Sequence, residues 1–253
     1  MNAIDIVSPY LAKFLFIFLR ASLVLMLLPF FGNQNMPAQF KIGFIVALSV
    51  VLTPVVKFDV HQGAVPFLVM REIVFGLLLG LAARFVFFGI EMAGHLMSNA
   101  MGLSIATSFD PEMGQSTAVS SIYGILAMLI FLAMDAHHDL IYIFVRSYEL
   151  APVGSIEVRN LAPEAIAITG RIFMVAMKLS APVVIIMVLT NLLLGFLSKA
   201  APQMNVFFVG FPVYVVVGFT VMILGLPVFA QVSGTFFSDI ENEMVRIIGM
   251  AKG

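Results

Sequence analysis

The sequence contains no cysteine and few charged residues. Without cysteine, the 253-residue chain can form no disulfide, no thiolate metal site and no cysteine nucleophile. Charged residues make up only 11% of the chain, against about 25% in an ordinary soluble domain, and 61% of its residues are hydrophobic. Together with a mean hydropathy of +1.09, this composition excludes a water-soluble globule and predicts a membrane protein.

The charges that remain are almost balanced. Thirteen basic and fourteen acidic residues leave a formal net charge of -1, which favours neither a nucleic-acid partner nor a polybasic lipid anchor. Lys13 and Arg20 interrupt the first apolar run, and no small-residue cleavage site follows it. We therefore expect the apolar N-terminus to be retained.

The signatures of common enzymes are also missing. The sequence has no G-x-x-x-x-G-K-[ST] phosphate loop, no H-E-x-x-H zinc helix and no G-x-S-x-G nucleophile elbow. We predict that the protein is not an enzyme and uses no cofactor. If it takes part in energised transport, the energy comes from elsewhere.

Six apolar blocks predict the fold. Several reach about 20 residues, the length at which a helix crosses a bilayer core of about 30 Å. Strand-like alternation is absent, and backbone polar groups in lipid must be satisfied internally, so we expect an all-α, membrane-type fold with about six helices. The blocks are Tyr10 to Phe31, Phe40 to Val56, Pro66 to Ile90, Ile122 to Val145, Ile172 to Ser198, and Val206 to Ala230.

Three of these blocks predict departures from straight spans. The run from Ile122 ends at Met134, after roughly 20 Å of helix, because the polar sequence DAHHD follows it. Prolines at 182, 212 and 227 lie within the last two blocks, where each removes a helical hydrogen bond and favours a kink. We predict that the last two blocks form a bent hairpin around Lys199 to Asn205.

One side of the third block carries a stripe of four residues. Glu72, Gly76, Gly80 and Arg84 recur at every fourth position, which places them along one side of a helix. Two glycines at that spacing allow the backbone of another helix to approach closely. We predict close helix packing there, with the two charges pairing with a neighbour. An ion pathway through Glu72 and Arg84 is the alternative.

The DAHHD sequence contains the types of side chain that bind metals. Asp135 lies one helical turn from both His138 and Asp139. Adjacent histidines project in different directions from a helix, however, and no further cluster of ligands is nearby in sequence. We predict a polar helix end or turn that contacts another subunit. A zinc site or proton relay that includes His137 is the alternative.

The longest run of small and hydroxylated residues extends from Gly102 to Ser121. Its glycines and Pro111 argue against a continuous helix, and only two acidic residues carry charge. A non-helical segment among membrane helices is tolerated where it is buried in protein or lines a watery cavity. Phe109 and Met113 add apolar bulk suited to closing such a cavity. The alternative is an exposed connector.

Five stretches, in the same order along the chain, resemble the R subunits of flagellar type III export gates, the FliR/SctT family. The resemblance covers nearly the whole chain, and the second and last stretches are its specific motifs. The stretches are Arg71 to Gly80, Gly102 to Gly114, Ala136 to Ile141, Pro152 to Gly154, and Ala201 to Pro212.

The resemblance implies a subunit that works in a hetero-oligomeric helical assembly. Members of this family occur as one copy with several P and Q subunits, FliP and FliQ, and form the channel by which unfolded flagellar proteins cross the bacterial inner membrane at the flagellar basal body. The other expected partners are the switch subunit FlhB, the export apparatus protein FlhA and membrane lipid. Residues 1–165 correspond to a P-like part, and residues 166–253 to a Q-like hairpin and tail.

The resemblance also assigns two sites. The segment at about 102–121 would fold into the lumen as a gating plug, with Phe109 as its stopper and glycines as hinges. The plug residues are Gly102, Ser104, Phe109, Asp110, Pro111, Met113 and Gly114. The hairpin tip would face the cytoplasmic entrance and the switch subunit, although the loop charges mildly favour the opposite side. Its contact residues are Lys199, Pro202, Gln203 and Asn205.

Two other functions fit parts of the same sequence. A secondary transporter would build its site from Glu72, Arg84, Asp135 and the two adjacent histidines, and would transport a substrate as a purified single chain. A purely structural subunit would nucleate assembly of the complex. It would tolerate replacement of Phe109 by alanine without a change in leakage or export.

Overall fold

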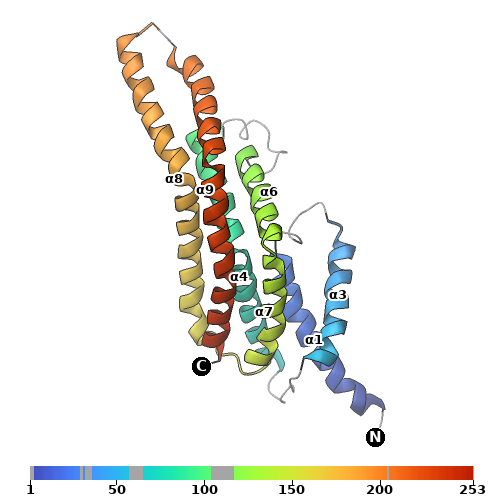
Figure 1. Ribbon diagram of the computed structural model, residues 1–253. Helices are drawn as coiled ribbons and strands as arrows, with labels where there is room; N and C mark the ends of the chain where they lie inside the picture. The colour runs from blue at the N-terminus through green and yellow to red at the C-terminus, as the bar shows by residue number, and fades with distance from the viewer. Residues whose placement is uncertain are drawn as a thin grey trace. The chain divides into compact units, whose positions relative to one another are not determined.

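The computed structural model describes residues 3–28, 31, 36–56, 65–103, 117–203 and 205–252. Over these ranges the regular structure is helical, which confirms the predicted all-α fold (Figure 1). The elements are α1 (Ala3–Leu27), α3 (Ala38–Val55), α4 (Val65–Ala100), α6 (Ala118–Ala133), α7 (Ala136–Leu150), the 3-10 helix η2 (Val158–Leu161), α8 (Ala162–Ala200) and α9 (Val206–Ala251).

Five of these helices are long and apolar enough to cross a membrane. The pair α6 and α7 forms a sixth candidate that is bent by 72° at its break, so the short fourth block is confirmed. Helices α4 and α9 continue past the predicted blocks, to Ala100 and Ala251. The predicted blocks are shorter because they follow apolar composition, whereas a helix ends where its terminal backbone groups are capped. The three prolines lie inside α8 and α9, which continue past them.

The chain divides into two compact units. Unit 1 contains Met1–Phe85, Asp135–Gly170 and Ser238–Gly253, and unit 2 contains Val86–Met134 and Arg171–Phe237. Helices α4, α8 and α9 therefore contribute residues to both units. This division follows contacts within the chain. The expected division at residue 165 concerns likeness to other subunits, and it stays a prediction.

An ion pair lies buried in unit 1. Arg20 on α1 and Glu72 on α4 both have no solvent-exposed surface. The guanidinium donates from Nε and Nη2 to the two carboxylate oxygens, each at 2.8 Å. Such a bidentate pair is among the stronger hydrogen-bonded contacts in proteins. It joins two helices through residues that are 52 positions apart in sequence.

The same guanidinium also binds α7 and the residue that follows it. Its Nη1 donates to the carbonyl oxygen and the Oγ of Ser147, at 3.0 and 3.2 Å, and its Nη2 donates to the carbonyl of Ala151 at 3.1 Å. The rings of Phe75 and Tyr148 lie 4.8 and 4.3 Å from its central carbon. All five N–H groups of Arg20 thus have an acceptor, as burial of a charge requires.

Helix α1 packs closely on α4 beside this ion pair. A Cβ added at Gly76 would lie 3.0 Å from Leu23 Cδ1, and one added at Gly80 would lie 3.1 Å from the carbonyl oxygen of Leu23. The two glycines therefore sit against α1, as small residues do where membrane helices meet. On its other side, α1 packs against α3 (Figure 1).

The start of α8 and the end of α9 are joined in unit 1. Arg246 on α9 forms an ion pair with Glu164 on α8, whose carboxylate is almost completely buried, and a second with Glu243. The backbone N–H of Glu157 donates to the carbonyl of Ala251 at 2.9 Å. The Arg246–Glu164 pair joins the two ends of the hairpin, and the Glu157 bond joins the residue before η2 to the end of α9.

Replacement of Glu72 by glutamine tests the buried pair. The substitution leaves the Arg20 charge buried without a counter-charge, which typically costs about 3–5 kcal/mol. We expect a large fall in the thermal unfolding midpoint of the protein in detergent. Glu91→Gln, at an exposed position of the same helix, is the matched control. It should change the free energy of unfolding by no more than about 0.5 kcal/mol and so leave the midpoint almost unchanged. Equal midpoints for the two variants would contradict the assignment.

Candidate functional site around the predicted plug

Most of the predicted plug lies outside the described residues. This applies to Ser104, Phe109, Asp110, Pro111, Met113 and Gly114. The structure does describe Gly102 and the residues that border the segment 104–116 on both sides. These borders, which belong to unit 2, define what the segment is attached to.

Gly102 ends α4 in a specific helix-terminating motif. Its φ is +74°, a left-handed conformation that glycine adopts without steric cost. Its N–H donates to the carbonyl of Asn99 at 3.1 Å, and the N–H of Leu103 donates to the carbonyl of Ser98 at 3.0 Å. This pair of bonds is the Schellman motif, which satisfies the free carbonyls of a helix end. Gly102 therefore has a structural task at the border of the segment.

Thr117 begins α6 on the other side of the segment. Its Oγ1 accepts a hydrogen bond from the N–H of Ser120 at 3.2 Å, and the Oγ of Ser120 donates to the Thr117 carbonyl at 2.8 Å. Threonine is a favoured residue at this position because its side chain satisfies a free N–H of the first helical turn. Both helix ends that border residues 104–116 are thus capped by their own residues.

The two bordering helices are in backbone contact. A Cβ added at Gly94 of α4 would lie 2.4 Å from Cα of Ser120 in α6. On the opposite side of α4, a Cβ at Gly89 would lie 2.6 Å from Cβ of Val175 in α8. Only glycine permits these approaches, so the positions of α4, α6 and α8 around the border depend on residues without side chains.

The methionines near this border are core residues. Met97 and Met101 have no exposed surface, and the Met101 side chain packs directly on Gly218 of α9. Methionine most often fills gaps in a core, and these two do so in unit 2. An aromatic cluster of Phe87, Phe131 and Phe237, with centroids 5.1 to 5.4 Å apart, adds to the interior of unit 2.

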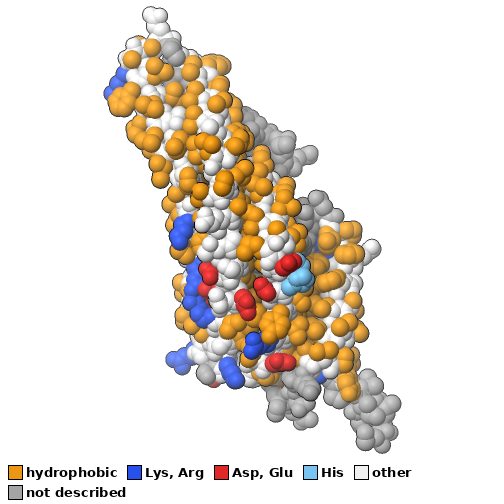
Figure 2. Space-filling view, viewed as in Figure 1, with side chains coloured by type: hydrophobic (Ala, Val, Ile, Leu, Met, Phe, Trp, Pro, Cys, Tyr) orange, Lys and Arg blue, Asp and Glu red, His pale blue; other side chains and the backbone are white. Residues whose placement is uncertain are grey.

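The predicted contact residues of the hairpin tip are all exposed. Helix α8 ends at Ala200 and α9 begins at Val206, which confirms the hairpin. Large apolar side chains accompany the tip, since Phe196 is 68% and Phe208 is 76% exposed. Figure 2 shows hydrophobic side chains over this end of α8 and α9. The exposed tip residues are Lys199, Pro202, Gln203 and Asn205.

Among the described residues, no contact joins the charged residues proposed for a transport site into one cluster. Both carboxylate oxygens of Glu72 accept hydrogen bonds from Arg20, so neither is open to a substrate. Arg84 is half-buried on α4. The partner residue Arg20 was missed as a site residue, although a single arginine in an apolar run is a signal for a buried pair.

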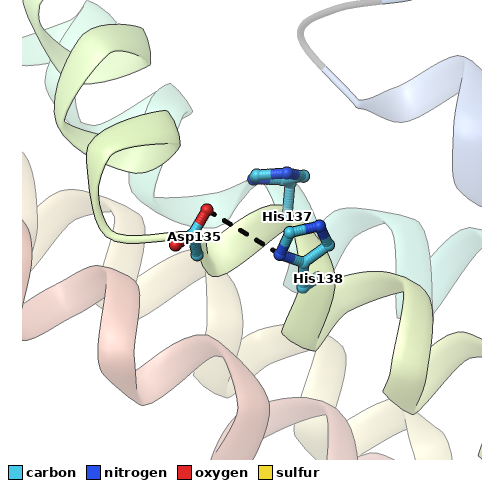
Figure 3. Close-up of side chains that lie close together, drawn as sticks. All are labelled: Asp135, His137 and His138. Atoms are coloured by element: carbon cyan, nitrogen blue, oxygen red, sulfur yellow. Dashed lines mark ion pairs between the residues drawn. The ribbon is translucent and has the colours of Figure 1, made fainter.

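Asp135, His137 and His138 do lie together (Figure 3). Asp135 Oδ1 is 3.7 Å from Nδ1 of His138, and the two imidazole rings have centroids 4.0 Å apart. The expectation that the adjacent histidines point apart is therefore wrong. Asp135 occupies the left-handed region, with φ 56° and ψ 17°, and this turns the chain between α6 and α7. Asp139 is exposed in the first turn of α7.

Gly94→Ala tests the packing of the bordering helices. The new methyl group would overlap the backbone of α6, and overpacking of this kind costs about 1–3 kcal/mol. We expect a lower thermal midpoint in detergent. Gly124→Ala is the matched control because a Cβ at Gly124 meets nothing within 4 Å, and alanine there should stabilise α6 by about 0.5–1 kcal/mol. A midpoint unchanged by Gly94→Ala would show that α4 and α6 are not in contact there.

The chain is similar to known export proteins over almost its full length. Residues 11–240 match the family of bacterial export proteins, family 1. The flagellar biosynthetic protein FliR of Bacillus subtilis (strain 168) is 32% identical, with 99% of this chain and 100% of that protein covered. FliR of Aquifex aeolicus is 30% identical over 91% of each chain, and FliR of Escherichia coli K12 is 29% identical over 91% of this chain and 90% of its own. The chain therefore belongs to the bacterial export proteins, family 1, together with these flagellar biosynthetic proteins.

Proposed function

We propose that this chain is a non-enzymatic core subunit of the flagellar type III export gate in the bacterial inner membrane. It would form part of the channel for unfolded flagellar proteins, and its residues 102–121 would act as the gating plug. One observation carries the proposal. In a chain that belongs to an export family, residues 104–116 lie between two helices that pack closely and whose ends are each capped by their own residues.

The proposed gating follows from how the segment is attached. Thirteen residues extend to at most about 45 Å, so the segment is long enough to be moved aside while both of its ends stay in place. Its sequence contains two acidic residues and no basic ones, so little charge needs to be desolvated when it blocks a conduit. At rest, apolar contacts of Phe109 and Met113 would hold it, and an incoming chain would displace it.

The helix lengths support an assembly that extends beyond the bilayer. Helix α9 has 46 residues and α8 has 39. At about 1.5 Å per residue, α9 is about 69 Å long, more than twice the bilayer core of about 30 Å. Helix α9 carries exposed apolar surface, such as that of Leu224, which is 75% exposed. We propose that P-type and Q-type subunits cover this surface, with FlhB and FlhA as further partners.

Deletion of residues 105–112 tests the plug. In cells that overproduce the chain together with its P-type and Q-type subunits, we expect the deletion to let small solutes leak across the membrane, measured as the rate of entry of a small dye. The conduit then lacks its stopper while the capped helix ends remain. The unaltered complex at equal abundance, and the deleted chain without partners, should not leak. Unchanged conductance in the deleted complex would contradict the proposal.

The same assay separates the two alternatives. Phe109→Ala should raise leakage if Phe109 is a stopper, and should have no effect if the chain only nucleates assembly. A secondary transporter would accumulate substrate as a purified single chain in vesicles, whereas a gate subunit transports nothing alone. Uptake by the lone chain would therefore overturn the export proposal.

Affinity purification tests the hairpin tip. The tagged chain is expected to co-purify P-type, Q-type and switch subunits, and Lys199→Glu should reduce the recovered switch subunit severalfold because it reverses the exposed charge at the proposed contact. Lys252→Glu reverses an exposed lysine at the end of the chain and is the matched control. Equal recovery of the switch subunit with both variants would place its contact elsewhere.

A further inference from the structure

We propose that Asp135, His137 and His138 bind one borderline divalent cation, of the class that includes Zn²⁺, Co²⁺ and Ni²⁺. Each residue offers one ligand atom, and the three atoms lie within 4.8 Å of one another. This site is separate from the predicted plug and the hairpin tip. The inference stands on the side-chain geometry and does not depend on the proposed export function.

The distances suit a single ion. Zinc bonds of about 2.0–2.1 Å place two ligand atoms of a tetrahedral site about 3.3 Å apart. The Asp135 and His138 atoms are already 3.7 Å apart. The side chains of both residues are at least 70% exposed, so small rotations about their side-chain bonds can close the remaining gap. The ion can reach the site because these two ligands face outward.

The local backbone brings the three side chains to one side. The left-handed conformation of Asp135 turns the chain at the start of α7, and aspartate adopts this conformation more readily than most residues. Ala136, the residue between the first two ligands, is buried and only 7% exposed. Asp135 and His138 are exposed, and the half-buried His137 lies beside them (Figure 3).

The ligand types select the class of ion. Two imidazoles with one carboxylate suit zinc and its first-row neighbours, whereas calcium and magnesium prefer oxygen ligands alone. The positive end of the α7 dipole disfavours a cation near its first turn. The carboxylates of Asp135 and Asp139, at the start of the same helix, oppose that effect. Three protein ligands leave further positions for water.

A cobalt titration tests this site. The full-length chain, purified in detergent with a tag that contains no histidine and stripped with a chelator, is titrated with Co²⁺ while its visible d–d absorption is recorded. Competition with Zn²⁺ then follows. We expect one Co²⁺ per chain, displaced by Zn²⁺ and not by an equal excess of Ca²⁺ or Mg²⁺. Binding that saturates without these properties would overturn the proposal, as would no saturable binding.

Substitutions assign the ligands. His137→Ala and His138→Ala should each weaken Co²⁺ binding at least about tenfold, since even the loss of groups that only support ligands has effects of that size. Asp135→Asn removes the charge and keeps a residue that tolerates positive φ, and it should weaken binding without unfolding α7. His95→Ala on α4 is the matched control and should bind as the unaltered chain does. Equal affinities for all four variants would exclude the site.

Discussion

The fold of unit 1 depends on the complete hydrogen bonding of the Arg20 guanidinium. A buried charge is tolerated only when its desolvation is offset, and here each of the five N–H groups has an acceptor. The acceptors come from α4, from α7 and from Ala151. A shift of either helix against α1 would leave a donor unsatisfied in an apolar interior. The pair therefore specifies one arrangement of α1, α4 and α7. Apolar packing alone would permit more than one arrangement.

Where no charge is present, glycine contacts determine which helices pack together. In a chain with 61% hydrophobic residues, burial of apolar surface does little to choose one helix neighbour over another, because lipid and protein are similarly apolar. Close backbone approach does select the neighbouring helix, since it requires a glycine at the point of contact. Gly76 and Gly80 provide this against α1, and Gly94 provides it against Ser120 of α6. Shape thus supplies the specificity that hydrophobicity lacks.

The sequence predicts what is local and misses what is paired at long range. Apolar length was enough to locate the helices, and the DAHHD interruption was enough to predict the broken fourth block. The partner of Glu72 lies 52 positions away, and no spacing rule connects the two. Adjacent positions of a helix diverge at Cβ, but rotation about the side-chain bonds brings the rings of His137 and His138 to 4.0 Å, which a helical wheel does not show. The roles of Phe109 and its neighbours stay predictions.

A gate needs a part that moves and a rim that does not. If residues 104–116 supplied the missing hydrogen-bond partners of α4 and α6, their displacement would expose free carbonyl and N–H groups and unravel both helix ends. Without the segment, the Schellman motif at Gly102 satisfies the carbonyls of Ser98 and Asn99, and the Thr117 cap satisfies the N–H of Ser120. Displacement would then cost only the contacts that the segment itself makes. In the proposed gate, the energy of opening would then be set by the contacts of residues 104–116 more than by the stability of α4 and α6.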